Sequence, residues 1–167
     1  RSCLVGSEMC IRDRPWVVTM EALEPFRVVG PARGPEDPEN LPYLRPDRPD
    51  QSLGIVCETA IRSAAMRGRG EDPFVISTGD FRHMHWTIEQ MLVHHTSSGC
   101  VMRSGDLIAS GTVSGPEPES RGCLLERTWR GSEPIQLPDG TERKFLQDGD
   151  EIIMRARCEM PGAVRIG

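Results

Sequence analysis

The sequence has no excess of positive charge and no long hydrophobic run. Lys144 is the only lysine among 20 basic residues, and 25 acidic residues bring the net charge to −5. A protein that binds nucleic acid regardless of sequence needs a basic surface, so this balance argues against that class. No apolar stretch approaches the roughly 20 residues of a membrane helix. We therefore expect a soluble protein.

The sequence has no closely spaced cysteine pair, and we expect no leader segment. The chain does not open with a basic stretch followed by an apolar one, which argues against a secretory signal. The six cysteines include no C-x-x-C pair and are scattered: Cys3, Cys10, Cys57, Cys100, Cys123 and Cys158. This pattern predicts reduced thiols and a cytoplasmic location, with a disulfide framework as the alternative.

The length and composition fit one domain or part of one. The chain has 167 residues, of which 37% are hydrophobic and 27% charged, enough to bury a core and too few charges for disorder. Residues 1–14 show neither helical nor strand periodicity, and we interpret them as a sequence artefact foreign to the domain. A strand-like pattern that begins at Val164 stops with the chain. We expect a domain truncated at both ends.

Short alternating stretches separated by glycine turns dominate the rest of the chain. They predict strands over 16–18, 53–61, 74–76, 107–109, 123–129, 135–137, 143–146 and 152–157. Six prolines in the segment 30–51 predict an extended loop without regular structure. The polar segment 62–72 predicts a turn.

One long helix is predicted over 81–97. Asp80 is suited to cap its start and Gly99 to end it. An apolar stripe at helical spacing lies between them, formed by Met84, Ile88, Met91, Leu92 and His95. A second, shorter helical turn is predicted to begin at Thr19 and to end at Pro25. The fold class is thus mainly β with one packed helix (α+β).

The four histidines suggest a metal site, but helical geometry argues against one. His83 and His85 are two residues apart and therefore point to different sides of a helix. His83 and His94 share a side but lie roughly 16 Å apart along the axis. His95 falls on the apolar stripe and is predicted to be a hydrogen-bonded core residue. We therefore assign no metal ligand to the histidines.

Two other features carry more chemistry. In the segment 110–119, Gly111 and Gly115 would let a ligand approach the backbone, while Thr112 and Ser114 offer hydroxyl groups. An ordinary loop is the alternative. Glu126 shares a face of the predicted 123–129 strand with Leu124, which favours a carboxylate partly shielded from water and paired for catalysis. A salt bridge to an arginine is the alternative there.

Together these segments resemble the C-terminal part of the fumarylacetoacetate hydrolase family. The superfamily pattern corresponds to Gly105-Asp106-Leu107-Ile108-Ala109-Ser110-Gly111-Thr112 and to Asp148-Gly149-Asp150-Glu151. Narrower stretches resemble the fumarylacetoacetases within it: Pro15-Trp16-Val17-Val18, His94-His95 with Gly99-Cys100, and Ser114-Gly115-Pro116-Glu117-Pro118-Glu119 running on to Leu125-Glu126. The resemblance covers residues 15–167, which would be a partial C-terminal catalytic domain.

The resemblance implies a mixed β-sandwich roll, a homodimer, and hydrolysis of a carbon–carbon bond in 4-fumarylacetoacetate to fumarate and acetoacetate, the last step of tyrosine and phenylalanine catabolism. It implies a Ca²⁺ or Mg²⁺ ion held by carboxylates, with a histidine as base. Glu126 matches the glutamate that orients this histidine, and Thr112 matches a threonine that contacts the substrate. The histidine and the metal ligands of the family lie upstream of Pro15, so none is assigned here, and the chain alone is expected to be inactive.

Two other functions remain open. One is another activity of the superfamily, namely an acylpyruvate hydrolase, a decarboxylase or an isomerase. The other is a noncatalytic fragment that keeps only a packing or dimer surface.

Overall fold

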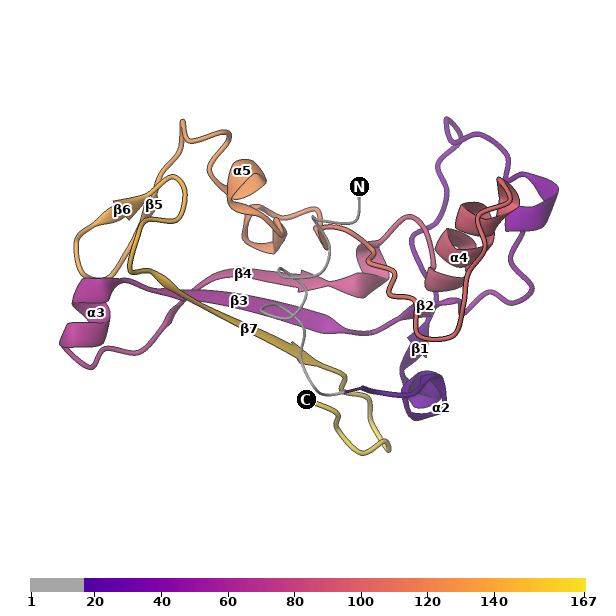
Figure 1. Ribbon diagram of the computed structural model, residues 1–167, viewed down its shortest axis with the longest axis horizontal. Helices are drawn as coiled ribbons and strands as arrows, with labels where there is room; N and C mark the ends of the chain where they lie inside the picture. The colour runs from indigo at the N-terminus through magenta and orange to yellow at the C-terminus, as the bar shows by residue number, and fades with distance from the viewer. Residues whose placement is uncertain (1–16) are drawn as a thin grey trace.

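A three-stranded antiparallel sheet runs through the middle of the computed structural model, which describes residues 17–167 (Figure 1). The strand β3 (Val56–Arg62) lies between β4 (Phe74–Asp80) and β7 (Glu151–Arg157). The predicted strand 152–157 is confirmed, and the predicted 74–76 strand extends to Asp80. The β3–β4 register shifts at Thr59/Ala60, which marks a bulge.

The hydrophobic core lies at one end of this sheet. Its buried members are Ile61, Met66, Ile76, Ile135 and Leu137. The short hairpin of β5 (Ile135–Gln136) and β6 (Glu142–Arg143) contributes the last two, and the predicted 143–146 strand is a strand only at Arg143.

A helix, α3 (Ala64–Gly68), stands where the sequence predicted only a polar turn. It forms because the Ser63 hydroxyl accepts a hydrogen bond from the Met66 backbone N–H at 3.1 Å, which caps the first turn. The Met66 side chain is completely buried. The cap and one apolar contact thus outweigh the polar composition of the segment 62–72.

The other end of the sheet carries the N-terminal elements. Thr19 caps α2 (Met20–Leu23), as predicted, and the 3-10 helix η1 (Glu24–Phe26) follows, so Pro25 continues the turn instead of ending it. The strand β1 (Arg27–Val28) pairs with β2 (Ser52–Leu53). The Gly54 N–H donates to the Phe26 carbonyl at 2.8 Å. That bond extends the β1–β2 pairing by one residue. The Ile55 N–H then donates back to the Leu53 carbonyl at 3.1 Å, in the turn that divides the predicted 53–61 strand into β2 and β3.

The proline-rich segment 30–51 has no strand along its length, as predicted. It contains one short 3-10 helix, η2 (Pro42–Leu44). This turn packs against α4 (Ile88–Ser97) at the right-hand end of the view in Figure 1.

The long helix is shorter at its start than predicted. Asp80 caps only the 3-10 helix η3 (Phe81–His83). Thr87 is the N-cap of α4 and forms a capping box with Gln90. The Thr87 hydroxyl accepts from the Gln90 N–H, and the Gln90 side-chain oxygen accepts from the Thr87 N–H. Gly99 follows the helix with φ +83°, as predicted for a C′ residue.

The predicted apolar stripe of α4 packs only in part, because Met91 is half-buried whereas other members of the stripe are exposed. Ile88 and Leu92 are 39% and 43% exposed, whereas Gln90 is only 8% exposed and donates through Nε2 to the Leu44 carbonyl at 2.8 Å. His95, predicted to be a core residue, is also exposed. The helix α4 packs against the η2 turn, and the Leu44 carbonyl at the end of that turn accepts its hydrogen bond from the polar Gln90 side chain.

The predicted strand 123–129 is wrong. Leu124–Arg127 form the helix α5, and the Arg127 Nε of this helix donates to the Ile76 carbonyl of β4 at 3.2 Å. The buried Thr128 ends it, donating from Oγ1 to the Leu124 carbonyl at 2.7 Å. Residues 107–109 also have no strand, and residues 17–18 have no regular structure, with Trp16 outside the described residues.

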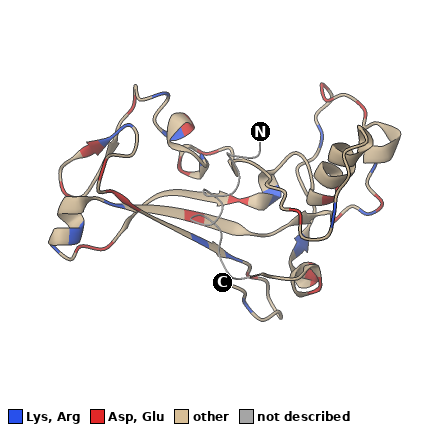
Figure 2. Ribbon diagram, in the orientation of Figure 1, with Lys and Arg blue, Asp and Glu red and all other residues tan. Residues whose placement is uncertain are grey.

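The fold is α+β, with short strands and short helices intermixed. In the described part of the chain there are four α-helices, not one, and three open sheets. None of the helices between residues 17 and 167 has the length and apolar character needed to cross a membrane. Figure 2 shows acidic and basic residues interspersed along the described part of the chain, and the net charge of the whole sequence is −5.

Candidate functional site

The loop that contains Thr112 and Ser114 lies against β4. A Cβ built at Gly79 of β4 would be 3.0 Å from the Val113 carbonyl oxygen, so the two backbones approach closely. The Ser77 hydroxyl donates to the Arg121 carbonyl at 2.7 Å, and the Gly115 N–H donates to the Ser120 carbonyl at 2.9 Å. These contacts fold the segment 112–122 back on itself over the sheet.

Glu126 is connected to this loop through Ser114. The Ser114 hydroxyl donates to Glu126 Oε2 at 2.6 Å and accepts from the Gly122 N–H at 3.1 Å. The bond from the backbone N–H uses a lone pair of the hydroxyl oxygen and orients the group, so that its single proton is directed at the carboxylate. Ser114 therefore holds Glu126 in a fixed position.

Gly122 is the point at which the segments of Thr112 and Glu126 meet. A Cβ there would lie 2.2 Å from the Val113 carbonyl oxygen and 2.7 Å from the Thr112 methyl carbon. Only glycine fits this gap. The structure thus brings the segments of both predicted site residues together around Gly122, with Ser114 as the direct link to Glu126.

The surroundings of Glu126 differ from those predicted. Because it lies on a helix, it does not share a face with Leu124, which packs against the core while Glu126 is exposed. The predicted shielding by Leu124 is therefore wrong. The carboxylate is held by a hydroxyl group at the surface.

A left-handed turn fixes the other end of α5. Trp129 and Arg130 have φ values of +46° and +57°, which non-glycine residues rarely adopt. The Gly131 N–H donates to the buried Thr128 hydroxyl at 3.0 Å, and the Arg121 guanidinium lies 4.7 Å from the Trp129 ring centroid. Sequence reasoning did not find Arg121 or Trp129, because no local pattern predicts a cation–π contact or a left-handed backbone.

The histidines do not gather into a metal site. His94 Nδ1 lies 3.3 Å from the Tyr43 hydroxyl, and His95 Nε2 lies 3.1 Å from Cys100 Sγ. Within residues 17–167, no three His, Cys, Asp or Glu side chains come together in a way that could hold a metal ion. The donor set that a divalent ion needs is therefore not provided by the described part of the chain.

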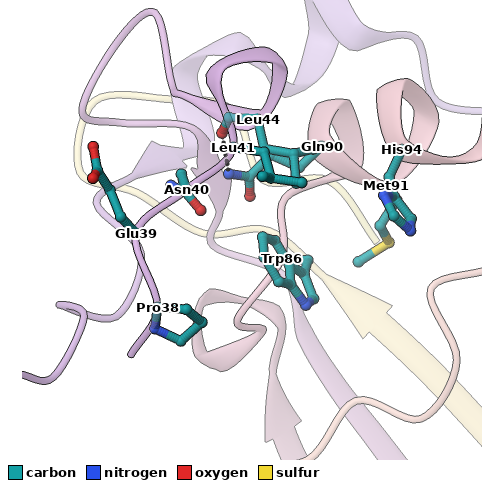
Figure 3. A pocket seen from close by; sticks show the side chains of 9 residues that line it. All are labelled: Pro38, Glu39, Asn40, Leu41, Leu44, Trp86, Gln90, Met91 and His94. Atoms are coloured by element: carbon teal, nitrogen blue, oxygen red, sulfur yellow. Dashed lines mark hydrogen bonds between the residues drawn. The ribbon is translucent and has the colours of Figure 1, made fainter. Parts of the chain in front are cut away.

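A separate cavity of about 430 Å³ lies between the proline-rich loop and α4 (Figure 3). Gln90 spans it through its bond to the Leu44 carbonyl, and Trp86 and Met91 form much of the apolar wall. Neither Thr112 nor Glu126 lines this cavity. It is not part of the site around Ser114.

The sequence comparisons identify the class of protein. Residues 11–165 match the family described as fumarylacetoacetate (FAA) hydrolase C-terminal, and the chain belongs to that family. Similar proteins include the fumarylacetoacetase of Bos taurus, 46% identical over 157 residues, which covers 92% of this chain and 34% of that protein. The fumarylacetoacetase of Oryza sativa subsp. japonica is 44% identical over 158 residues, which covers 95% of this chain and 35% of that protein. The fumarylacetoacetase of Arabidopsis thaliana is 44% identical over 148 residues, which covers 89% of this chain and 33% of that protein. The chain thus spans about a third of the length of these relatives.

Proposed function

We propose that this chain is the C-terminal part of a fumarylacetoacetase, which hydrolyses a carbon–carbon bond of 4-fumarylacetoacetate to give fumarate and acetoacetate. Identities of 44–46% to proteins of that name over about nine-tenths of the chain support this activity. The observation in the structure that carries it is the Ser114–Glu126 hydrogen bond of 2.6 Å beside the Thr112 segment.

Each site residue has a proposed task. Glu126 accepts a hydrogen bond from one ring nitrogen of a histidine, which keeps the other nitrogen free to take a proton from water. Ser114 keeps the Glu126 carboxylate oriented, and the Thr112 hydroxyl contacts the carboxylate end of the substrate. The histidine itself comes from the part of the enzyme that this chain does not include.

The intact enzyme is proposed to be a cytoplasmic homodimer that uses Ca²⁺ or Mg²⁺. The described residues bring together no set of side chains that could hold this ion, so we assign none of them a role in binding it. Residues 15–167 are proposed to be the domain itself, which closes into a mixed β-sandwich roll with the upstream sequence. Residues 1–14 are proposed to be foreign to it.

A chimera tests the activity. Residues 15–167 replace the corresponding third of the Bos taurus fumarylacetoacetase, and fumarate release from 4-fumarylacetoacetate is measured. We expect turnover by the chimera and none by the 167-residue chain alone, because the histidine base is proposed to lie upstream of Pro15. A folded chimera that cleaves an acylpyruvate but not 4-fumarylacetoacetate would favour the other superfamily activity. Turnover by the chain alone would contradict the fragment interpretation.

A further inference from the structure

His95 and Cys100 form a pair that the proposed hydrolysis does not use. His95 lies in the last turn of α4, and the left-handed Gly99 reverses the chain just after it. The reversal brings Cys100 Sγ to within 3.1 Å of His95 Nε2. Both side chains are exposed, so a reactant can reach them. A cysteine in contact with an imidazole is the arrangement that activates thiols for nucleophilic attack.

A groove of about 600 Å³ begins at this pair and follows the segment 100–109. Apolar side chains form most of its wall, including the exposed Val101, Leu107 and Ile108. Apart from the pair itself, Asp106 is the one titratable residue that lines the groove in the described part of the chain. Its Oδ2 accepts from the Arg103 N–H at 2.7 Å. The groove therefore offers a mainly apolar surface beside a nucleophile and a base, and the Asp106 carboxylate disfavours anionic reactants.

We propose that Cys100 is a covalent addition site for neutral α,β-unsaturated ketones, with His95 as its base. The Cys100 proton passes to His95 Nε2, in the tautomer that carries its hydrogen on Nδ1. The sulfur then forms a bond to the β-carbon while the carbon–carbon π bond breaks. The resulting enolate takes a proton at the α-carbon from the imidazolium. The thiol has added across the double bond, and no oxidant or reductant is needed.

Two of the three other described cysteines provide internal comparisons. Cys158 is buried and Cys57 is half-buried. Burial is the main reason that the pKa of each thiol is raised above its usual value. A raised pKa means less thiolate at neutral pH, and the thiolate is the nucleophile. These two thiols should therefore react slowly in the folded chain.

The test uses the full 167-residue chain, reduced and then treated with ethyl vinyl ketone at pH 7. Peptide mass spectrometry gives the initial rate of adduct formation at each cysteine. Cys100 should react about tenfold faster than Cys57 or Cys158. An unassisted thiol is only a few per cent ionised at this pH, whereas His95 can take the Cys100 proton as the sulfur attacks. The His95→Ala and His95→Gln variants should lower the Cys100 rate about tenfold, because both remove the base that takes the thiol proton.

His94→Ala is the matched control. His94 is the neighbouring histidine, is also exposed, and contacts Tyr43 instead of the thiol. It should leave the Cys100 rate unchanged. Equal rates at Cys100 and Cys57, or equal losses in the His94 and His95 variants, would overturn the proposal. The addition uses neither Glu126 nor Thr112, so its outcome does not depend on the proposed hydrolysis.

Discussion

Arg143 binds Asp150 with two parallel hydrogen bonds, from Nε to Oδ2 at 2.9 Å and from Nη2 to Oδ1 at 3.0 Å. Their side chains are only 9% and 2% exposed. The pair joins β6 to the turn before β7, and the Gln147 N–H adds a third bond to Asp150 at 2.9 Å. The Asp-Gly-Asp-Glu pattern seen in the sequence therefore has a structural purpose: Asp150 ties the small hairpin to the central sheet.

The first prediction is that Asp150→Asn destabilises the chain. Loss of the carboxylate leaves Arg143 buried and unpaired, which costs about 3 kcal/mol of unfolding free energy. Urea unfolding measures it. Glu39→Gln is the control, because the Glu39–Arg45 pair is largely exposed and its loss should cost about 1 kcal/mol or less. Equal losses in the two variants would show that burial adds nothing to the Arg143–Asp150 pair.

The same pair predicts a pH dependence. The Arg143 guanidinium is the main cause that lowers the pKa of Asp150 below its usual value. Because the pKa is lowered in the folded state, the ionised Asp150 carboxylate adds to the unfolding free energy above the usual carboxyl pKa of about 4. This stabilisation is lost as the pH falls below that value. The stability difference between the wild-type chain and Asp150→Asn should therefore narrow on acidification. A difference that stays constant down to pH 2 would contradict this.

The second prediction concerns Asp139 in the β5–β6 turn. The Ser63 hydroxyl, followed by the Thr141 hydroxyl and N–H, donates to this carboxylate and lowers its pKa to about 2. The stabilisation should be complete above about pH 5 and should fade between pH 4 and 2. Unfolding of the wild-type chain and of Asp139→Asn at several pH values measures the difference. A stability difference between the two chains that is largest at low pH would show that the Asp139 carboxylate does not stabilise the folded chain in its ionised form.

The sequence predicted those elements whose signal is local. The strands at 135–136 and 151–157, the Thr19 cap and the proline-rich loop follow from neighbouring residues alone. The helix α5 was missed because Leu124-Leu125-Glu126 is too short to distinguish a period of 2 from one of 3.6. Its end depends on Thr128, which also donates to the Lys144 carbonyl at 3.2 Å, a partner sixteen residues away.

Residue chemistry drew attention to Thr112 and Glu126, but it left an ordinary loop and a salt bridge open as alternatives. Only the family resemblance gave the two residues their proposed roles, and nothing in their spacing showed that their segments meet. The bond between Ser114 and Glu126 joins residues twelve apart in sequence. The buried face of α4 was likewise unpredictable, because it depends on the Leu44 carbonyl, which lies in a loop without periodicity.

The third prediction compares two glycines. Gly122→Ala would place a Cβ 2.2 Å from the Val113 carbonyl oxygen, so the Thr112–Ser114 segment must move. We expect a loss of about 1–3 kcal/mol in unfolding free energy. Gly68→Ala at the end of α3 meets nothing within 4 Å and should change stability by less than about 1 kcal/mol, in the stabilising direction. Equal effects in urea unfolding would mean that Gly122 is not a tight contact point.

The last prediction separates the tasks of Glu126 and Ser114 in the active chimera. Glu126→Gln should lower kcat by about 10³-fold or more with little change in KM, because the amide cannot stabilise the imidazolium formed during catalysis. Ser114→Ala should lower kcat by only about tenfold, since it loosens the carboxylate without removing it. The double variant should be no slower than Glu126→Gln alone, because Ser114 acts through Glu126.

Ser132→Ala is the control for this comparison. Its hydroxyl is also exposed and donates to a nearby carbonyl, that of Trp129 at 2.7 Å, but it does not contact Glu126. It should leave kcat unchanged. Urea unfolding of each variant distinguishes catalysis from folding, since Glu126 is exposed and its replacement should cost little stability. If Glu126→Gln instead unfolded the chimera while its folded fraction kept the full rate, Glu126 would be a structural residue, and Ser114 would have no carboxylate to position for catalysis.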